Sequence, residues 1–258
     1  MTHKNPAPMA VTRLVFSAAT RLVNSRGYGL VDKWRHEVLA SLLPRRCQFC
    51  GSHSADQAIC TACAAELPWN YSACPRCARP QNHRGVCADC LAHPPAFGAA
   101  WAPFQLQAPV QQRIHAIKYR ADFGSARLLA RLMARAAPRP LPAQAVLIPV
   151  PLHRRRLWQR GYNQSLELAR ELHRELKLPL QPGWARRLRT TADQIGMDAA
   201  ARRRNLRNAF AVDARVAGRC VILLDDVMTT GATLHELARA CRRAGASEVW
   251  AWALARVA

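Results

Sequence analysis

The sequence predicts an α/β protein in which a parallel sheet flanked by helices follows a small cysteine-rich module. Apolar runs at residues 145–150 and 220–224 are typical of buried strands, and a further strand is expected over 248–256. Helical patterns alternate with these runs, as in βαβ units around a parallel sheet. Eight of the ten cysteines, in contrast, lie within residues 47–90.

The expected helices have recognisable starts and stops. Ser165 is the expected N-cap of one helix, and Gly245 ends another. Between the first strand and Ser165, the arginine-rich stretch 154–160 is expected to be a loop. The helices are expected over residues 110–119, 123–136, 165–177 and 233–244.

Charge divides the chain of 258 residues into three segments, which we take as the expected domains. Residues 1–46 carry a net charge of +6, residues 47–100 are neutral, and residues 101–258 carry +16. A total of +22 favours anionic partners such as phosphates, nucleic acid or a membrane surface. A hydrophobic content of 50% excludes global disorder.

The first segment is expected to be a basic tail with a helix. Arg13 and Arg21 interrupt its apolar stretch, so a secretory signal fits poorly and a cytoplasmic protein is expected. A helical stripe beginning at Val11 could dock on a membrane surface or a partner, but a frayed tail is the simpler interpretation. No apolar run is long enough to predict a transmembrane helix.

The cysteine block predicts two structural zinc sites. Four Cys-x-x-Cys pairs form a repeat of 27 residues, and two such pairs supply the four thiolates of a tetrahedral site. A disulfide framework or a redox-active pair is a weaker interpretation, because four pairs occur within 44 residues. The pairs could close sequentially or interleave, and the sequential arrangement is preferred. The expected ligands are Cys47, Cys50, Cys60 and Cys63, then Cys74, Cys77, Cys87 and Cys90.

A second motif follows the strand expected at 220–224. Residues 221–233 comprise an apolar strand, the acidic pair Asp225 and Asp226, and a Thr/Gly turn that opens a helix. Such a turn presents backbone N–H groups to an anion, while carboxylates beside it can accept hydrogen bonds from sugar hydroxyls. The pattern therefore predicts a site for a ribose 5-phosphate.

This stretch resembles the phosphoribosyl-pyrophosphate (PRPP) binding motif of the type I phosphoribosyltransferases. The resemblance implies that Asp225 and Asp226 are the catalytic pair that holds the ribose hydroxyls. It also implies that Mg2+ bridges the ribose hydroxyls and the pyrophosphate. It also implies a phosphoribosyltransferase-like fold for residues 101–258. The 5-phosphate is then expected on Thr229, Thr230, Gly231, Ala232 and Thr233, and the pyrophosphate on Arg160, Asn163 and Gln164.

Further features narrow the resemblance to the ComF competence family, which includes GntX-like proteins. It covers residues 35–258 and includes the cysteine module, whereas the first 30 residues or so have no counterpart in the family pattern. A mobile hood over the site is implied for residues 190–208. The additional features are Lys118-Tyr119, Pro149-Val-Pro151, Arg160-Gly-Tyr-Asn-Gln164, Gln194, Arg202-x-x-Asn205 and Ala209-Phe210.

Two functions compete on these observations. The preferred one is a DNA-uptake protein of natural transformation that binds PRPP and holds single-stranded DNA on a basic surface, with other DNA-uptake proteins as partners. Arg202, Arg203 and Arg204 are the candidate DNA contacts. The alternative is an active phosphoribosyltransferase that transfers phosphoribose from PRPP to a nucleobase or related nucleophile.

Overall fold

The computed structural model describes residues 46–54, 58–189 and 206–258. The chain divides into two compact units, Met1–Thr61 and Ala62–Ala258. The tail and helix expected before residue 46 lie outside the described residues.

The described elements run in chain order as follows. They are α3 (Thr61–Glu66), α4 (Ala88–Ala92), β1 (Ala99–Trp101), β2 (Phe104–Gln105), α5 (Val110–Arg120), α6 (Phe123–Ala136), β3 (Val146–Pro149), α7 (Arg154–Arg160), α8 (Gln164–Leu176), η1 (Pro182–Trp184), β4 (Ala185–Arg187), β5 (Phe210–Val212), η2 (Ala214–Val216), β6 (Cys220–Met228), α10 (Ala232–Arg243) and β7 (Glu248–Arg256).

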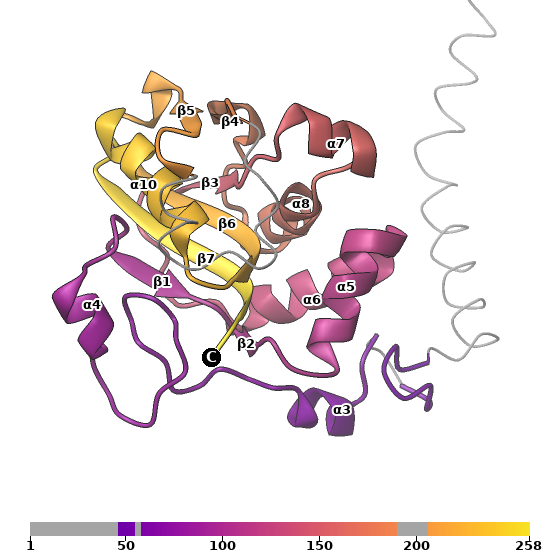
Figure 1. Ribbon diagram of the computed structural model, residues 1–258. Coiled ribbons are helices and arrows are strands. Elements are labelled where there is room, and N and C mark those ends of the chain that lie inside the picture. Colours follow the sequence, from indigo (N-terminus) through magenta and orange to yellow (C-terminus); the bar gives the residue numbers. More distant parts are fainter. Residues whose placement is uncertain (1–45, 55–57, 190–205) are drawn as a thin grey trace, which may run out of the picture. The chain divides into compact units, whose positions relative to one another are not determined.

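The second unit is built around a parallel sheet in the order β1-β7-β6-β3, with β2 also paired to β7 (Figure 1). The predicted parallel sheet is therefore confirmed. In the register of β3 and β6, Pro149 lies beside Leu224, and the Val150 N–H donates to the Leu224 carbonyl at 2.8 Å. The carboxyl ends of these two strands consequently meet at one edge of the sheet.

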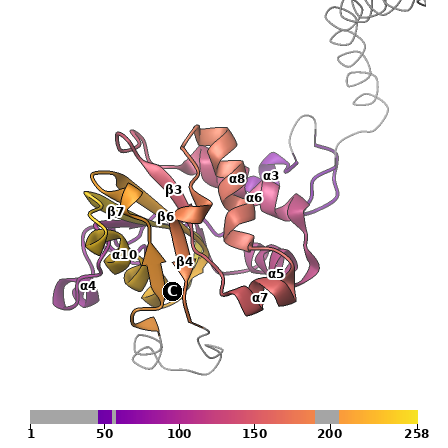
Figure 2. The same ribbon diagram turned by 90° about the horizontal axis from the view of Figure 1, so that it is seen from above.

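Helices cover both faces of this sheet, with α10 on one face and α6 and α8 on the other (Figure 2). Successive side chains of a strand point to opposite faces. On β6, Val221 and Leu223 belong to the core cluster that includes Leu234 and Leu237 of α10. The alternate residues of the same strand, such as Ile222, are fully buried outside that cluster. This double burial explains why the strands appeared in the sequence as continuous apolar runs.

The cysteine-rich part of the second unit is hydrogen-bonded to the edge of the sheet. The Ala100 N–H, on β1, donates to the Pro75 carbonyl at 2.9 Å. The buried Asn70 side chain donates to the carbonyls of Ala78 and Ala102, at 2.9 and 3.2 Å. These bonds fix the turn that follows Cys74 against the strand layer.

Three local expectations were wrong. The arginine-rich loop is the short helix α7, because the His153 side chain caps it by accepting the Arg155 N–H. The strand expected to stop at residue 224 continues to Met228 through its pairing with β7, so the acidic pair lies within β6. The N-cap of α8 is Asn163, not Ser165.

Antiparallel strands β4 and β5 bracket the segment expected to form the hood. Most of that segment, including Gln194, Arg202, Arg203 and Arg204, lies outside the described residues. Trp184 and Phe210, which flank it, are buried. Within the described ranges, no helix is long and apolar enough to cross a membrane.

Candidate functional site

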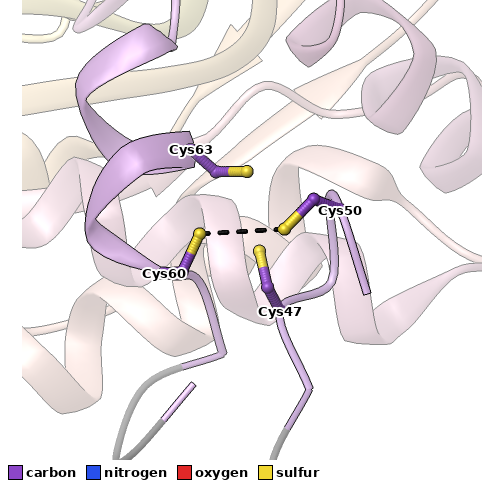
Figure 3. A group of neighbouring side chains, drawn as sticks. All are labelled: Cys47, Cys50, Cys60 and Cys63. Carbon is purple, nitrogen blue, oxygen red and sulfur yellow. Dashed lines mark hydrogen bonds between the residues drawn. The ribbon is translucent and has the colours of Figure 1, made fainter. Parts of the chain in front are cut away.

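The first group of cysteines consists of Cys47, Cys50, Cys60 and Cys63, whose sulfur atoms all lie within 4.8 Å of one another. Figure 3 shows the four thiols pointing toward a common centre, with the Sγ atoms of Cys50 and Cys60 3.8 Å apart. The first pair of thiols is held by a turn in which the Gly51 N–H donates to the Cys47 carbonyl at 2.9 Å. The second pair lies at the start of α3.

The second group repeats this arrangement with Cys74, Cys77, Cys87 and Cys90, again within 4.8 Å of one another. The Sγ atoms of Cys77 and Cys87 are 3.7 Å apart, and the Cys87 N–H donates to the Cys74 sulfur at 3.3 Å. Each group takes its four cysteines from one sequence repeat. The arrangement is therefore sequential.

Both groups fit zinc. Four sulfurs at about 2.3 Å from a tetrahedral Zn2+ lie about 3.8 Å from one another. The sulfur–sulfur distances of 3.8 Å in the first group and 3.7 Å in the second agree with this spacing. Burial opposes ionisation of the Cys47 and Cys74 thiols, but hydrogen bonds from neighbouring backbone N–H groups prevail and lower their pKa values to about 6 and about 7. Thiolates are the form that binds metal. With four cysteine ligands, each site has no open position, and its zinc would be structural.

The motif at residues 225–233 comprises the end of β6, a short loop at residues 229–231 and the start of α10. Gly231 has a φ of +74°, a left-handed conformation that favours glycine, and it is the N-cap residue of α10. The Thr230 hydroxyl accepts the Ala232 N–H at 3.3 Å. Thr229 and Thr230 are exposed. The loop thus places two exposed threonines beside the N-terminus of a twelve-residue helix, which suits a phosphate.

The acidic pair at the end of β6 is held by two different partners. Lys118, on α5, forms an ion pair with the buried Asp226 at 2.8 Å. Asp225 accepts the Ser165 hydroxyl at 3.0 Å and the Asp226 N–H at 2.9 Å, both through Oδ1. The pair is therefore positioned by α5 and α8 as well as by its own strand.

Asp225 is also electrostatically unusual. Burial, followed by the charge of Asp226, raises the pKa of its carboxyl to about 7, although Lys118 and the two hydrogen bonds act in the opposite direction. Two carboxylates beside one ammonium leave an excess negative charge. A cation such as Mg2+, or sugar hydroxyls that donate hydrogen bonds, would stabilise the ionised pair.

The segment after β3 brings the remaining candidates to the same edge of the sheet. The Asn163 amide donates to the Val150 carbonyl at 3.0 Å and accepts the Ser165 N–H at 3.0 Å. Arg160 donates to the Gln164 side chain at 2.7 Å, and its guanidinium lies 5.6 Å from the Tyr119 ring centroid. Asn163 therefore caps the start of α8, while Arg160 and Gln164 are hydrogen-bonded to each other.

Sequence reasoning missed several of these contacts. Ser165 was assigned to a helix cap, yet its hydroxyl serves Asp225. Lys118 was noted only as part of the family resemblance, and its partner Asp226 is 108 residues away in the chain. A basic residue in a helix signals no partner by itself, so only the packing of α5 beside β6 could reveal the pair.

Comparisons with known proteins agree with this architecture. A model described as "Double zinc ribbon domain" matches residues 38–91, and one described as "Phosphoribosyl transferase domain" matches residues 163–257. DNA utilization protein YhgH of Salmonella typhi is 35% identical over 206 residues, which cover 77% of this chain and 90% of that protein. Competence protein F of Haemophilus influenzae is 34% identical over 222 residues, covering 82% and 96%. The chain belongs to the ComF family.

Membership confirms the predicted order of a zinc ribbon module followed by a phosphoribosyltransferase fold in this ComF protein. Among solved structures, glutamine PRPP amidotransferase from B. subtilis aligns with a TM-score of 0.36 and 19% identity, covering 51% of this chain and 26% of that chain.

Proposed function

We propose that this ComF protein acts in DNA uptake. As a second part of the proposal, it binds PRPP or another ribose 5-phosphate with Mg2+ at residues 225–233. As a third part, it holds single-stranded DNA on a basic surface. The names of its relatives, DNA utilization protein and competence protein, support the first part. The second part, the binding of PRPP, rests on the acidic pair just before the N-terminus of α10. In this pair Asp226 forms an ion pair with Lys118, and Asp225 accepts a hydrogen bond from Ser165.

The loop and the acidic pair offer complementary chemistry to a phosphorylated ribose. Thr229, Thr230 and the N–H groups after Gly231 would bind the 5-phosphate, while Asp225 and Asp226 would accept hydrogen bonds from the ribose hydroxyls. Mg2+ would neutralise the acidic pair and the pyrophosphate together. Arg160 and Gln164 would meet the pyrophosphate from the β3 side of the sheet edge.

This part of the proposal is tested by calorimetric titration of the zinc-loaded full chain with PRPP and Mg2+. The double substitution Asp225→Asn and Asp226→Asn should weaken binding at least about tenfold, because carboxylate acceptors form the stronger hydrogen bonds. Asp213→Asn, on the exposed turn before η2, is the matched control and should bind normally. Equal affinity in all three proteins would exclude the acidic pair from the site.

A basic surface with exposed aromatic rings supports the DNA part of the proposal. Trp158 on α7 is 88% exposed and Tyr119 on α5 is 64% exposed. Arg154 and Arg155 are exposed on the same short helix as Trp158, and α7 contains no acidic residue. The contact between Arg160 and the Tyr119 ring joins α7 to α5. Arginines beside aromatic rings are the usual means of holding single-stranded DNA without sequence preference.

Salt dependence distinguishes specific phosphate contacts from general positive charge. Each arginine that neutralises a phosphate contributes about −0.7 to the slope of log affinity against log salt, so Arg154→Gln with Arg155→Gln should reduce that slope by about 1.4. Trp158→Ala should weaken binding at every salt concentration, because a stacking platform is lost. Arg170→Gln with Arg174→Gln removes the same charge from α8 and should change the slope little. A flat salt dependence, or equal effects of both double variants, would contradict the assignment.

An activity assay on the same purified protein distinguishes a DNA-handling protein that binds PRPP from an active phosphoribosyltransferase. PRPP and Mg2+ are incubated with a panel of nucleobases, and pyrophosphate release is followed. No release above the rate without protein is expected for a DNA-handling protein that uses PRPP as a ligand. Release that depends on one base would identify a phosphoribosyltransferase instead.

A further inference from the structure

Arg256 is a buried cation at the end of β7, with 2% of its surface exposed. Its guanidinium donates to four backbone carbonyls. Nε donates to Cys77 at 2.9 Å, and Nη1 donates to Met228 at 3.0 Å, to Val257 at 2.6 Å and to Thr229. One side chain therefore contacts segments that are about 150 residues apart in sequence.

The two segments are the second cysteine group and the candidate phosphate loop. Cys77 is one of the four thiols of that group, and its carbonyl belongs to the turn that presents the thiol. Met228 and Thr229 lead directly into the loop that ends at Gly231. The guanidinium is thus a direct bridge between a zinc-ligating turn and the backbone of the proposed 5-phosphate site.

The charge of Arg256 requires a partner, because an isolated buried cation is strongly unfavourable. Within the described ranges, none of the recorded ion pairs joins Arg256 to a carboxylate. The titratable groups that face it are the thiols of Cys77 and Cys87 and the guanidinium of Arg79. Zn2+ with four thiolates has a net charge of −2, which is the neutralising charge that this position lacks.

We propose that Arg256 is a positioning residue that makes the order of the phosphate loop depend on zinc in the second cysteine group. With zinc bound, the cluster fixes the Cys77 turn and neutralises Arg256, and Arg256 then holds the carbonyls of Met228 and Thr229. Without zinc, the turn loosens and the loop loses its anchor. The four carbonyls that accept from Arg256 belong to Cys77, Met228, Thr229 and Val257, so zinc in the first cysteine group should not affect the loop.

Hydrogen exchange of the ligand-free, full-length protein tests this link without relying on PRPP. Exchange in the peptide 227–235 is compared with exchange in the strand segment 220–224. Arg256→Met and Cys87→Ser should each speed exchange in 227–235 by about tenfold or more, the effect of losing one charge-assisted hydrogen bond, and leave 220–224 protected. Arg79→Met, beside the same group, and Cys60→Ser, in the first group, are the matched controls and should leave 227–235 unchanged.

The outcomes separate positioning from general stability and from the proposed function. Faster exchange in 220–224 as well would mean that Arg256 only supports the sheet. An unchanged exchange rate of the 227–235 peptide in Cys87→Ser would overturn the zinc dependence. That result can be obtained even if Arg256→Met fails to fold. Arg256→Lys keeps the charge but not the fork of donors, so it should give an intermediate exchange rate. The phosphate-binding role of this loop rests on the proposed function. Absence of PRPP binding by the wild-type chain in calorimetry would refute that function while the exchange result still decides the link.

Discussion

Replacing Asp225 by asparagine is expected to stabilise the ligand-free protein above neutral pH. Burial and the neighbouring charge of Asp226 raise the pKa of this carboxyl from 3.8 to about 7. Asparagine can keep the shape, because Oδ1 alone accepts both the Ser165 hydroxyl and the Asp226 N–H. The substitution therefore removes a charge while it retains both hydrogen bonds.

The magnitude follows from the linkage between protonation and folding. A carboxyl with a raised pKa holds its proton more tightly in the folded state, so the wild-type protein loses stability as pH rises from about 4 to about 7 and regains it as pH falls over the same range. The shift from 3.8 to about 7 sets an upper limit of about 4 kcal/mol at pH 8. The expected advantage of Asp225→Asn is about 1 to 4 kcal/mol at pH 8, decreasing by more than half at pH 5.

Urea unfolding at pH 8, 6.5 and 5, with zinc present throughout, measures this difference. Zinc release at low pH affects variant and wild type alike, so comparison at each pH removes it. Asp213→Asn is the control of opposite sign, because hydrogen bonds from Arg215 lower the pKa of Asp213 to about 2. That variant should lose stability equally from pH 5 to 8. An Asp225→Asn protein that is no more stable than wild type at pH 8, or whose advantage is the same at pH 5, would refute the reasoning.

Two further predictions concern the metal and the loop. Metal analysis of the purified protein should find two equivalents of zinc per chain, and less than about one equivalent would contradict the assignment of the eight cysteines. Gly231→Ala should lower stability by about 1 kcal/mol, because its φ is left-handed. The added Cβ would meet the Met228 side chain only at 3.8 Å, an ordinary contact, so the loss should appear in thermal unfolding without disruption of the core.

The predictable parts of the fold are those in which neighbouring residues determine the outcome. Cysteine spacing predicts two four-thiol groups, because two tight turns are enough to close a tetrahedron, but it left sequential and interleaved pairing both possible. Residues 248–256 and 123–136 were predicted with the bounds that the structure has, since their apolar patterns are strong and end at clear signals. The acidic pair and the glycine of the phosphate loop were likewise visible as a continuous motif.

The remaining features depend on tertiary packing. Continuation of β6 beyond Leu224 is due to its hydrogen bonds with β7, which extend the strand past the acidic residues to Met228. Ser165 could cap a helix or serve a neighbouring strand, and only the approach of α8 to β6 decides between the two. Arg256 looked like one more basic residue at the end of a strand. Its burial follows from the docking of the second cysteine group against the sheet edge.

The position of β7 has a consequence for how the protein is made. It is the last described strand in chain order, yet it lies between β1 and β6 in the sheet. During synthesis, β3 and β6 can pair as soon as both have left the ribosome, whereas the parallel pairing of β1 and β2 with β7 waits until residues 248–256 emerge. A nascent chain would therefore carry a metal-loaded N-terminal module beside an unpaired strand edge, which is prone to aggregation. Early metal loading and rapid completion of the chain would shorten the time for which that edge is exposed.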